Sequence, residues 1–464
     1  MLKTFKLGGI HPNDMKLSAG SAIKQLPVPS EVKVPIAQHI GAPAKPIVAV
    51  GDSVKVGQLI AEANGFVSAN IHSPVSGKVK KIEDFVDGNG ARKPAIVITV
   101  EGDEWEPTID RSSAIRREIT MEPKDIIARV KDMGIVGMGG ATFPAHVKLS
   151  VPPGQKCEAL IINGVECEPY LTSDHRLMLE HGEEILIGIS ILMRALGVGK
   201  AIIGIENNKR DAIDNLTRLA SQFKGIEVQP LKLRYPQGGE KQLIDACIGR
   251  QVPSGKLPIN VGAVVQNVGT VYAIYEAVQK NKPLIERVVC VTGKPLREPC
   301  NLLVRIGTPV KNLIDEAGGM PDDCGKVIGG GPMMGRAFTN IDVPVVKGTS
   351  GITLMNQVDA RRPEIANCIR CAKCVGVCPM GLEPYLISKL SMLSRFDDAR
   401  AERIYDCIEC GCCSFTCPSN RPLLDWIRLG KGKVMAQIRA EAAAKKAAAD
   451  AEKAKAEAEK AKAN

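Results

Sequence analysis

Two runs of cysteines near the C-terminal end constrain this chain more than any other feature. Each run has the spacing C-x2-C-x2-C-x3-C and is followed by proline, Pro379 or Pro418. The runs comprise Cys368, Cys371, Cys374 and Cys378, then Cys407, Cys410, Cys413 and Cys417. Thiolates at this spacing are typical of [4Fe-4S] clusters. The sequence therefore predicts two such clusters and the transfer of single electrons.

The spacing also predicts which cysteines share a cluster. Three thiolates two residues apart can turn inward around one cubane, whereas the fourth, next to proline, faces away and is expected to ligate the other cluster. The predicted sets are Cys368, Cys371, Cys374 and Cys417 for cluster 1, and Cys407, Cys410, Cys413 and Cys378 for cluster 2. Cys412 is left over. Zinc is an alternative, although zinc ribbons usually use two separated C-x2-C pairs, and a disulfide framework is typical of much shorter secreted chains.

Length and composition bound the class of protein. A chain of 464 residues is expected to form about three domains of ~150 residues each. The opening MLKTFKLGGIHPND lacks the apolar core of a signal peptide, which favours a reducing cytoplasm. The longest apolar stretch, 185–193, is far shorter than the ~20 residues of a membrane span. Any membrane association is therefore expected to be peripheral.

The charge of the chain does not indicate nucleic-acid binding. The net charge is +10, but Lys and Arg are spread along the chain and aromatic residues make up only 3% of it. Side chains on which bases could stack are therefore scarce. A solvated surface, an acidic partner protein or an anionic membrane face explains the charge better.

Changes in residue composition and hydrophobic pattern along the sequence predict a multidomain α/β chain. A β-rich region is expected at 1–110, a layered α/β domain at 111–285, a small β-grasp module of the SLBB type at 286–348, a helical two-cluster domain at 349–432, and an Ala/Lys/Glu-rich tail at 433–464. The first region resembles a lipoyl-like β-hammerhead, but the segment Asn64–Asn70 has no lysine that could carry an acyl group. A docking or structural role is favoured for it. The tail is expected to form an exposed helix.

A glycine-rich loop, GIVGMGGATFP at 134–144, stands between two helical segments. Such a loop lets backbone N–H groups approach a phosphate at a helix N-terminus. Neither a P-loop nor the G-x-G-x-x-G dinucleotide pattern is present. Taken alone, the loop is also consistent with a flexible turn.

Three ordered motifs indicate a family. GMGGATFPAHVK resembles the flavin loop G-R-G-G-A-G-F-P-x-G-x-K of the NADH-dehydrogenase subunit of respiratory complex I, NGVECEP at 163–169 resembles its N-A-D-E-S-E-P, and QNV at 266–268 resembles its N-N-V. With GGIHP near the N-terminus, the β-grasp module and the doubled cysteine run, the chain up to its tail resembles the C subunit of the Rnf complex. That complex is a membrane-bound, ion-translocating ferredoxin:NAD oxidoreductase.

The resemblance implies cofactors and site residues. It implies a Rossmann-like domain that binds FMN and NAD(H), with two [4Fe-4S] clusters and no catalytic side chain, because bound FMN transfers the hydride. Gly137, Gly139 and Gly140 would wrap the FMN phosphate and ribityl chain, and Lys148 would supply a cation. Asn163, Gln266 and Asn267 would contact flavin or phosphate. Phe143, Glu166 and Glu168 would line the flavin and nicotinamide sites, and Gly238 and Glu240 of YPQGGE would belong to a second nucleotide loop.

The resemblance also implies partners and a location. The partners would be the other subunits of a membrane complex, including integral membrane subunits and a ferredoxin-like subunit, with ferredoxin acting indirectly. The chain would lie on the cytoplasmic side of the inner membrane, in a complex that couples electron transfer to Na+ or H+ translocation.

Two alternatives stay open, and departures from the complex I pattern motivate the first of them. Met138 replaces an arginine, Thr142 a glycine, Val165 an aspartate and Gly239 a glutamate, so the pocket has lost charged groups. A non-catalytic electron-transfer subunit with a degenerate flavin pocket is one alternative. A soluble cobalamin reductase of bacterial microcompartments, which has a very similar order of modules, is the other.

Overall fold

The computed structural model describes residues 2–463, and it describes side chains for residues 2–445 and 447–449. The chain divides into two compact units. The first comprises residues 1–6 and 11–361, and the second comprises residues 7–10 and 362–464. Within the described residues, no helix combines the length and the apolar character needed to cross a bilayer.

The first unit begins with two small antiparallel sheets. One has the order β2 (Glu31–Pro35), β8 (Arg92–Val100), β7 (Gly77–Val86) and β4 (Ser53–Val54), and the other has the order β3 (Lys45–Pro46), β5 (Leu59–Glu62) and β6 (Ile71–His72). Alternation in β2 turns Val32 and Val34 inward, where they pair with Ile98 and Ile96 of β8. This apolar face is why the short strands form a stable layer.

A parallel sheet of four strands forms the centre of the first unit. Its order is β11 (Ile226–Leu231), β10 (Ala201–Glu206), β9 (Ala159–Asn163) and β12 (Ala263–Asn267). The strands are nearly continuous apolar runs because both faces are covered. From β9 the chain proceeds outward to β10 and β11, and then returns to β12 on the other side of β9. The carboxyl ends of β9 and β12 are therefore the switch point at which open α/β sheets bind ligands.

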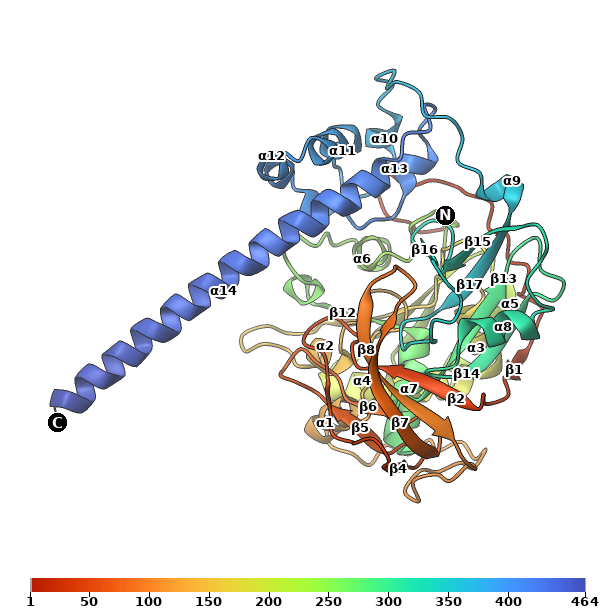
Figure 1. Ribbon diagram of the computed structural model, residues 1–464, viewed down its shortest axis with the longest axis vertical. Helices are drawn as coiled ribbons and strands as arrows, with labels where there is room; N and C mark the ends of the chain where they lie inside the picture. The colour runs from red at the N-terminus through yellow and green to blue at the C-terminus, as the bar shows by residue number, and fades with distance from the viewer. Residues whose placement is uncertain (1, 464) are drawn as a thin grey trace. The chain divides into compact units, whose positions relative to one another are not determined.

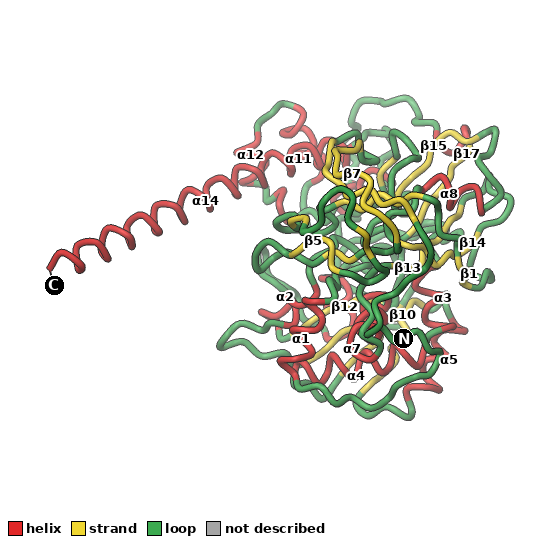
Figure 2. The backbone as a smooth tube through the Cα atoms, turned by 60° about the horizontal axis from the view of Figure 1, so that its bottom comes forward, coloured by secondary structure: helices red, strands yellow, loops and turns green. Residues whose placement is uncertain are grey.

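Helices cover both faces of this sheet. They are α1 (Pro123–Asp132), α2 (Ala145–Leu149), α3 (Ser173–Glu180), α4 (Gly182–Leu196), α5 (Arg210–Ala220), α6 (Glu240–Ile248) and α7 (Val268–Gln279). Side chains of α4, α5 and α7 share one apolar cluster with β9 and β10, whereas α6 packs on the opposite face. Figure 2 shows α4, α5 and α7 near β10 and β12.

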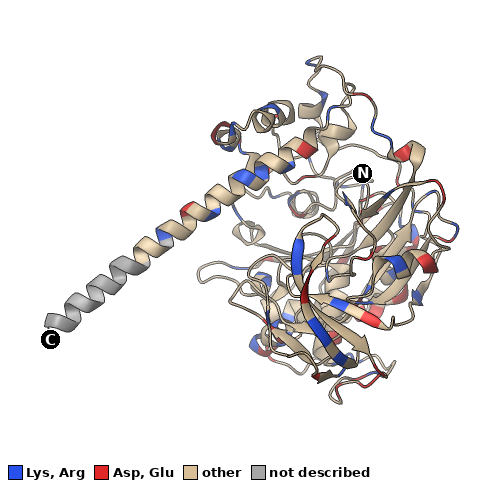
Figure 3. Ribbon diagram, in the orientation of Figure 1, with Lys and Arg blue, Asp and Glu red and all other residues tan. Residues whose placement is uncertain are grey.

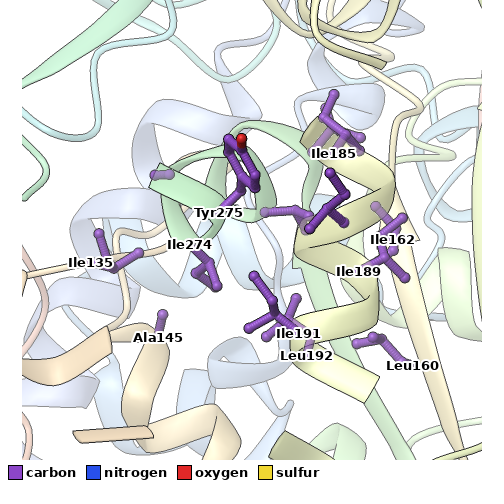
Figure 4. Packing of buried hydrophobic residues seen from close by; sticks show 14 of the residues in the cluster. Ile135, Ala145, Leu160, Ile162, Ile185, Ile189, Ile191, Leu192, Ile274 and Tyr275 are labelled. Carbon is purple, nitrogen blue, oxygen red and sulfur yellow. The ribbon is translucent and has the colours of Figure 1, made fainter. Parts of the chain in front are cut away.

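Helices α4 and α7 pack against each other in this core. Ile185 and Ile189 of α4, Ile274 and Tyr275 of α7, and Leu160 of β9 belong to one buried apolar cluster (Figure 4). Each isoleucine is fully buried, and burying one such side chain contributes roughly 1.5–3 kcal/mol. The packing fixes the start of α7, which immediately follows β12 at the switch point.

A mixed sheet of six strands completes the first unit. Its order is β1 (Ile23–Gln25), β14 (Cys300–Arg305), β13 (Glu286–Thr292), β17 (Gly351–Asn356), β15 (Cys324–Gly329) and β16 (Arg336–Ala337). Helix α8 (Val310–Glu316) packs on it through Leu313 and Ile314. The edge strand β1 comes from the N-terminal region and pairs in parallel with β14. The sequence patterns did not predict this exchange.

The second unit is helical. It contains α10 (Lys373–Gly376), α11 (Pro384–Met392), α12 (Phe396–Ala401), α13 (Cys412–Phe415) and α14 (Leu423–Ala463). The two cysteine runs repeat one local backbone: Arg370 and Ala372 have left-handed φ values, and so do Glu409 and Gly411 in the equivalent positions. Ile387, Ile404 and Ile427 are among the residues of its apolar core.

Helix α14 is by far the longest element (Figure 1) and includes the tail that begins at residue 433. Both signs of charge lie along the part of α14 whose side chains are described (Figure 3). The predicted helix is thus continuous with the cluster domain. The predicted exposure of the tail's last residues, from 450 onward, lies outside the described side chains.

Candidate nucleotide site and cluster ligands

Two asparagines mark the switch point of the parallel sheet. Asn163 ends β9, Asn267 ends β12, and the two are aligned in the register of the strands. The Asn163 Nδ2 donates to the carbonyl oxygen of Gly238 at 2.8 Å. The Asn267 Oδ1 accepts from the backbone N–H of Gly269 at 2.8 Å and so caps α7. The structure thus brings three predicted site residues to one edge of the sheet.

The glycine-rich loop lies over the N-terminus of α7. The two ends of the loop are joined by a hydrogen bond, in which Gly137 N donates to Phe143 O at 2.9 Å. Met138 N donates to Thr270 Oγ1 at 2.9 Å, and the Met138 side chain is buried in the main core. Gly139 and Gly140 are exposed. The loop therefore presents its two central glycines to solvent above the helix start.

The approach of this loop to Asn267 requires glycine. A Cβ at Gly139 would lie 2.6 Å from Asn267 Nδ2, which is far closer than real contacts allow. A Cβ at Gly140 would meet nothing within 4 Å. Open space is thus available beside Gly140, while Gly139 is packed against the cap of α7.

Two helix N-termini meet beneath the loop. The carboxylate of Glu166 accepts from the backbone N–H of Asp174 at 2.9 Å and of His175 at 3.2 Å, so it caps α3. Asn267 Nδ2 in turn donates to Asp174 Oδ2 at 2.6 Å. Burial and the nearby Glu166 charge raise the pKa of Asp174 to about 7. Sequence reasoning missed Asp174, whose only signal was its place in the first turn of the helix after NGVECEP.

Lys148 and Glu240 form an ion pair near the same strand ends. Lys148 Nζ lies 2.6 Å from Glu240 Oε1 and also donates to the carbonyl oxygen of Val265 at 3.2 Å. The pair joins α2 to the first turn of α6. Next along the chain, Gln266 is 2% exposed, and its Nε2 has no hydrogen-bond partner among the described residues. A buried amide in this state fits a site that takes a polar ligand.

Glu168 contacts a different module. Its carboxylate accepts from the backbone N–H groups of Met333 at 3.1 Å and Met334 at 2.6 Å, and from the Tyr235 hydroxyl at 3.3 Å. Burial raises the pKa of Glu168 to about 7 even though these hydrogen bonds oppose the shift. The structure therefore places Glu168 against the loop that follows β15.

Two lysines absent from any motif hold the loop between β9 and α3. Lys16 Nζ donates to the carbonyl oxygens of Glu166 and Glu168, each at 2.9 Å, and of Leu171 at 2.7 Å. Lys209 is 1% exposed and donates to Val165 O at 2.7 Å. Burial lowers the pKa of Lys209 to about 8. These contacts fix the backbone that carries Glu166 and Glu168.

In the second unit, cysteines of both runs line one cavity. Its walls include all four cysteines of the predicted cluster 2 set, Cys378, Cys407, Cys410 and Cys413, and also the fully buried Cys412. Cys374 lies in the apolar core of this unit and Cys417, from the other run, packs against the same core, whereas Cys368 and Cys371 are exposed.

Among the residues that the structure describes, no three His, Cys, Asp or Glu side chains converge closely enough to hold one ion. In a [4Fe-4S] cluster, by contrast, each of four thiolates binds a different iron.

Comparison with known proteins shows the family. Residues 3–103 match the RnfC barrel sandwich hybrid domain, residues 130–276 the Nuo51 FMN-binding domain and residues 288–337 the SLBB domain. The chain is 47% identical to the C subunit of the proton-translocating ferredoxin:NAD(+) oxidoreductase complex of Clostridium ljungdahlii, over 86% of each chain. The chain belongs to the RnfC family. The resemblance to this family and to the FMN-binding subunit of complex I is thereby confirmed.

Other members of the RnfC family match over nearly the whole chain. The C subunit of the Na(+)-translocating ferredoxin:NAD(+) oxidoreductase complex of Acetobacterium woodii is 44% identical over 94% of this chain and 98% of its own length. The C subunit of the ion-translocating oxidoreductase complex of Rhodobacter capsulatus is 44% identical over 93% of this chain and 84% of its own. A chain of an NAD+-reducing [NiFe]-hydrogenase has a TM-score of 0.48 at 20% identity, over 60% of this chain and 54% of its own, a likeness too weak to support an argument.

Proposed function

We propose that this chain is the FMN- and NAD(H)-binding, iron–sulfur subunit of a membrane-associated ferredoxin:NAD+ oxidoreductase that couples electron transfer to Na+ or H+ translocation. One observation carries the proposal: a match to a flavin-binding domain family and a doubled cysteine run occur in the same chain. Such a chain is suited to transfer electrons between a two-electron carrier and one-electron carriers. The names of its relatives as subunits of such complexes support the partners that the resemblance implies. The peripheral location on the cytoplasmic side is part of the proposal.

The switch-point edge fits FMN. The N-terminus of α7 carries partial positive charge suited to a phosphate, and Gly139 and Gly140 leave their backbone accessible. Gln266 offers a buried amide without a partner among the described residues. When bound, FMN exchanges a hydride with nicotinamide and single electrons with iron–sulfur clusters.

The chain's own residues would bind and orient this flavin. In the proposal Gly137, Gly139 and Gly140 surround the phosphate and ribityl chain, Asn163 and Asn267 offer amides, and Lys148 offers a cation. Glu166 keeps α3 capped so that its N-terminus stays in place. The remaining proposed contacts are Phe143, Glu168, Gly238, Glu240 and Gln266. The modules would be a hammerhead at 1–110, the nucleotide domain at 111–285, a β-grasp module at 286–348, the cluster domain at 349–432 and the tail at 433–464.

The cysteines would hold two clusters in a crossed arrangement. The cavity shared by Cys378 with three cysteines of the second run supports cluster 2, and the position of Cys374 and Cys417 at one apolar core supports cluster 1. These thiols would supply the one-electron path to and from the flavin.

The flavin site can be tested by blocking the open space beside Gly140. Gly140→Trp should abolish bound FMN and NADH-dependent dye reduction while leaving cluster absorption intact. Gly199→Trp is the control, because Gly199 is also exposed, with nothing within 4 Å of its Cβ position. Retention of flavin and NADH activity by Gly140→Trp would contradict the proposed site. Purification without integral membrane subunits would favour the cobalamin reductase alternative.

A further inference from the structure

The first three residues of the GGIHP motif, Gly8 to Ile10, belong to the cluster unit, whereas His11 and Pro12 belong to the first unit. Residues Leu7–Ile10 belong to the second unit, although the residues on either side belong to the first. Gly9 N donates to the carbonyl oxygen of Val377 at 2.9 Å. We call Leu7–Ile10 the N-terminal strap.

The strap packs on the backbone of the turn that carries Cys378. A Cβ at Gly8 would lie 2.5 Å from the Cys378 carbonyl carbon and 2.6 Å from both the Cys378 and the Val377 carbonyl oxygens. Gly8 also has a φ of +68°, a backbone conformation that is energetically unfavourable for residues other than glycine. All three close atoms are backbone, so a side chain at Gly8 could be accommodated only by moving the strap or the turn.

The strap spans the length of this turn. At its far end, a Cβ at Gly381 would approach Leu7 Cδ2 to 3.2 Å. Within the turn, Gly381 N donates to Cys378 O at 3.2 Å, and Leu382 N donates to Cys378 Sγ at 3.4 Å. The strap therefore covers the backbone of the turn, while Cys378 also lines the cavity that it shares with the second run.

We propose that the N-terminal strap is a positioning element for cluster 2, holding Cys378 where it can ligate the cluster built mainly on Cys407, Cys410 and Cys413. The proposal rests on the proposed function. Cys378 is the one ligand of this cluster that comes from a distant part of the chain, so the second run cannot place it. Burial and hydrogen bonds to the ligating sulfur set the potential of such a cluster, and the strap constrains the turn that provides both.

The test uses the full chain, purified anaerobically in its complex. Gly8→Ala should selectively remove the EPR signal of cluster 2 or shift its midpoint potential, and where the cluster is lost the iron content should fall by about half. Cluster 1 and bound FMN should be unchanged. Cys407→Ala provides the reference spectrum of cluster 1 alone. Gly255→Ala is the matched control, because Gly255 has the same φ of +68° and open space around its Cβ position.

A gentler variant protects the test against misfolding. Leu7→Ala removes the contact over Gly381 without adding any atom, and should also change the midpoint potential of cluster 2 but not of cluster 1. If Gly8→Ala loses both clusters, the midpoint potentials measured for Leu7→Ala test the role of the strap. Wild-type spectra and potentials for cluster 2 in Leu7→Ala would overturn the role of the strap. A wild-type chain without any cluster would instead refute the proposed function.

Discussion

The side-chain Nδ2 of Asn267 donates a 2.6 Å hydrogen bond to Oδ2 of Asp174. This contact joins the end of β12 to the first turn of α3, so that two helix N-termini are held at the switch point. It also places a carboxyl group that titrates near pH 7 next to the glycine-rich loop.

Asp174 should make FMN binding depend on pH. Its pKa is raised to about 7, so the group is neutral below pH 7 and negative above it, where it repels a phosphate. The dissociation constant of FMN from the flavin-free chain should therefore increase about tenfold between pH 6 and 8, which corresponds to ~1.4 kcal/mol. Fluorescence titration should show a smaller increase for Asp174→Asn. Asp214→Asn, at an exposed site on α5, is the control. An identical pH profile for Asp174→Asn and wild type would show that Asp174 is not the titrating group.

Gly139→Ala should damage the cap of α7. The added Cβ would lie 2.6 Å from Asn267 Nδ2 and 2.8 Å from its Cγ, so Asn267 would have to leave its hydrogen bonds to Gly269 and Asp174. Loss of a helix cap costs ~1 kcal/mol, and FMN affinity should fall at least about tenfold. Gly199→Ala, where the Cβ meets nothing within 4 Å, should match wild type in thermal unfolding and flavin titration. A Gly139→Ala variant with wild-type affinity would mean that the loop tolerates the added atom.

Some of this site could be predicted from sequence because its residues follow recognisable strands. Asn163 and Asn267 each end an apolar run, and parallel strands bring such ends to one edge. For Met138, in contrast, the comparison of motifs indicates only the loss of a charge. The structure places its side chain in the core and uses its backbone N–H to hold the loop to Thr270.

Other features depend on contacts between distant parts of the chain, for which periodicity gives no signal. Lys16 reaches carbonyl groups some 150 residues away, and β1 joins a sheet built mostly from residues after 285. Likewise, the close approach of Gly8 to Cys378 explains a glycine that the local sequence leaves unexplained.

Lys16 should influence nucleotide binding by positioning the loop after β9. Lys16→Met removes the donor to three carbonyl oxygens, and each unsatisfied group costs roughly 1–3 kcal/mol if it stays buried. The loop should relax, raising the KM for NADH about tenfold with a smaller effect on kcat and with FMN retained. Steady-state kinetics with a dye acceptor would measure this, and Lys24→Met at an exposed position of β1 is the control. An unchanged KM for NADH would show that Lys16 does not influence nucleotide binding.

Replacing the fourth cysteine of each run by alanine should distinguish the crossed from the uncrossed assignment of cluster ligands. Cys378→Ala should perturb the EPR signal of the cluster held by Cys407, Cys410 and Cys413. Cys417→Ala should perturb that of the cluster held by Cys368, Cys371 and Cys374. Variants of Cys407 and Cys368 identify which signal belongs to which run. If each fourth cysteine affected only the signal of its own run, the crossed arrangement would be wrong.

The cofactor content of the anaerobically purified protein tests the central claim most directly. A chain that joins a flavin site to two four-iron clusters should contain about one FMN and about eight atoms each of iron and acid-labile sulfide. Colourless protein with neither bound flavin nor labile sulfide would contradict the account.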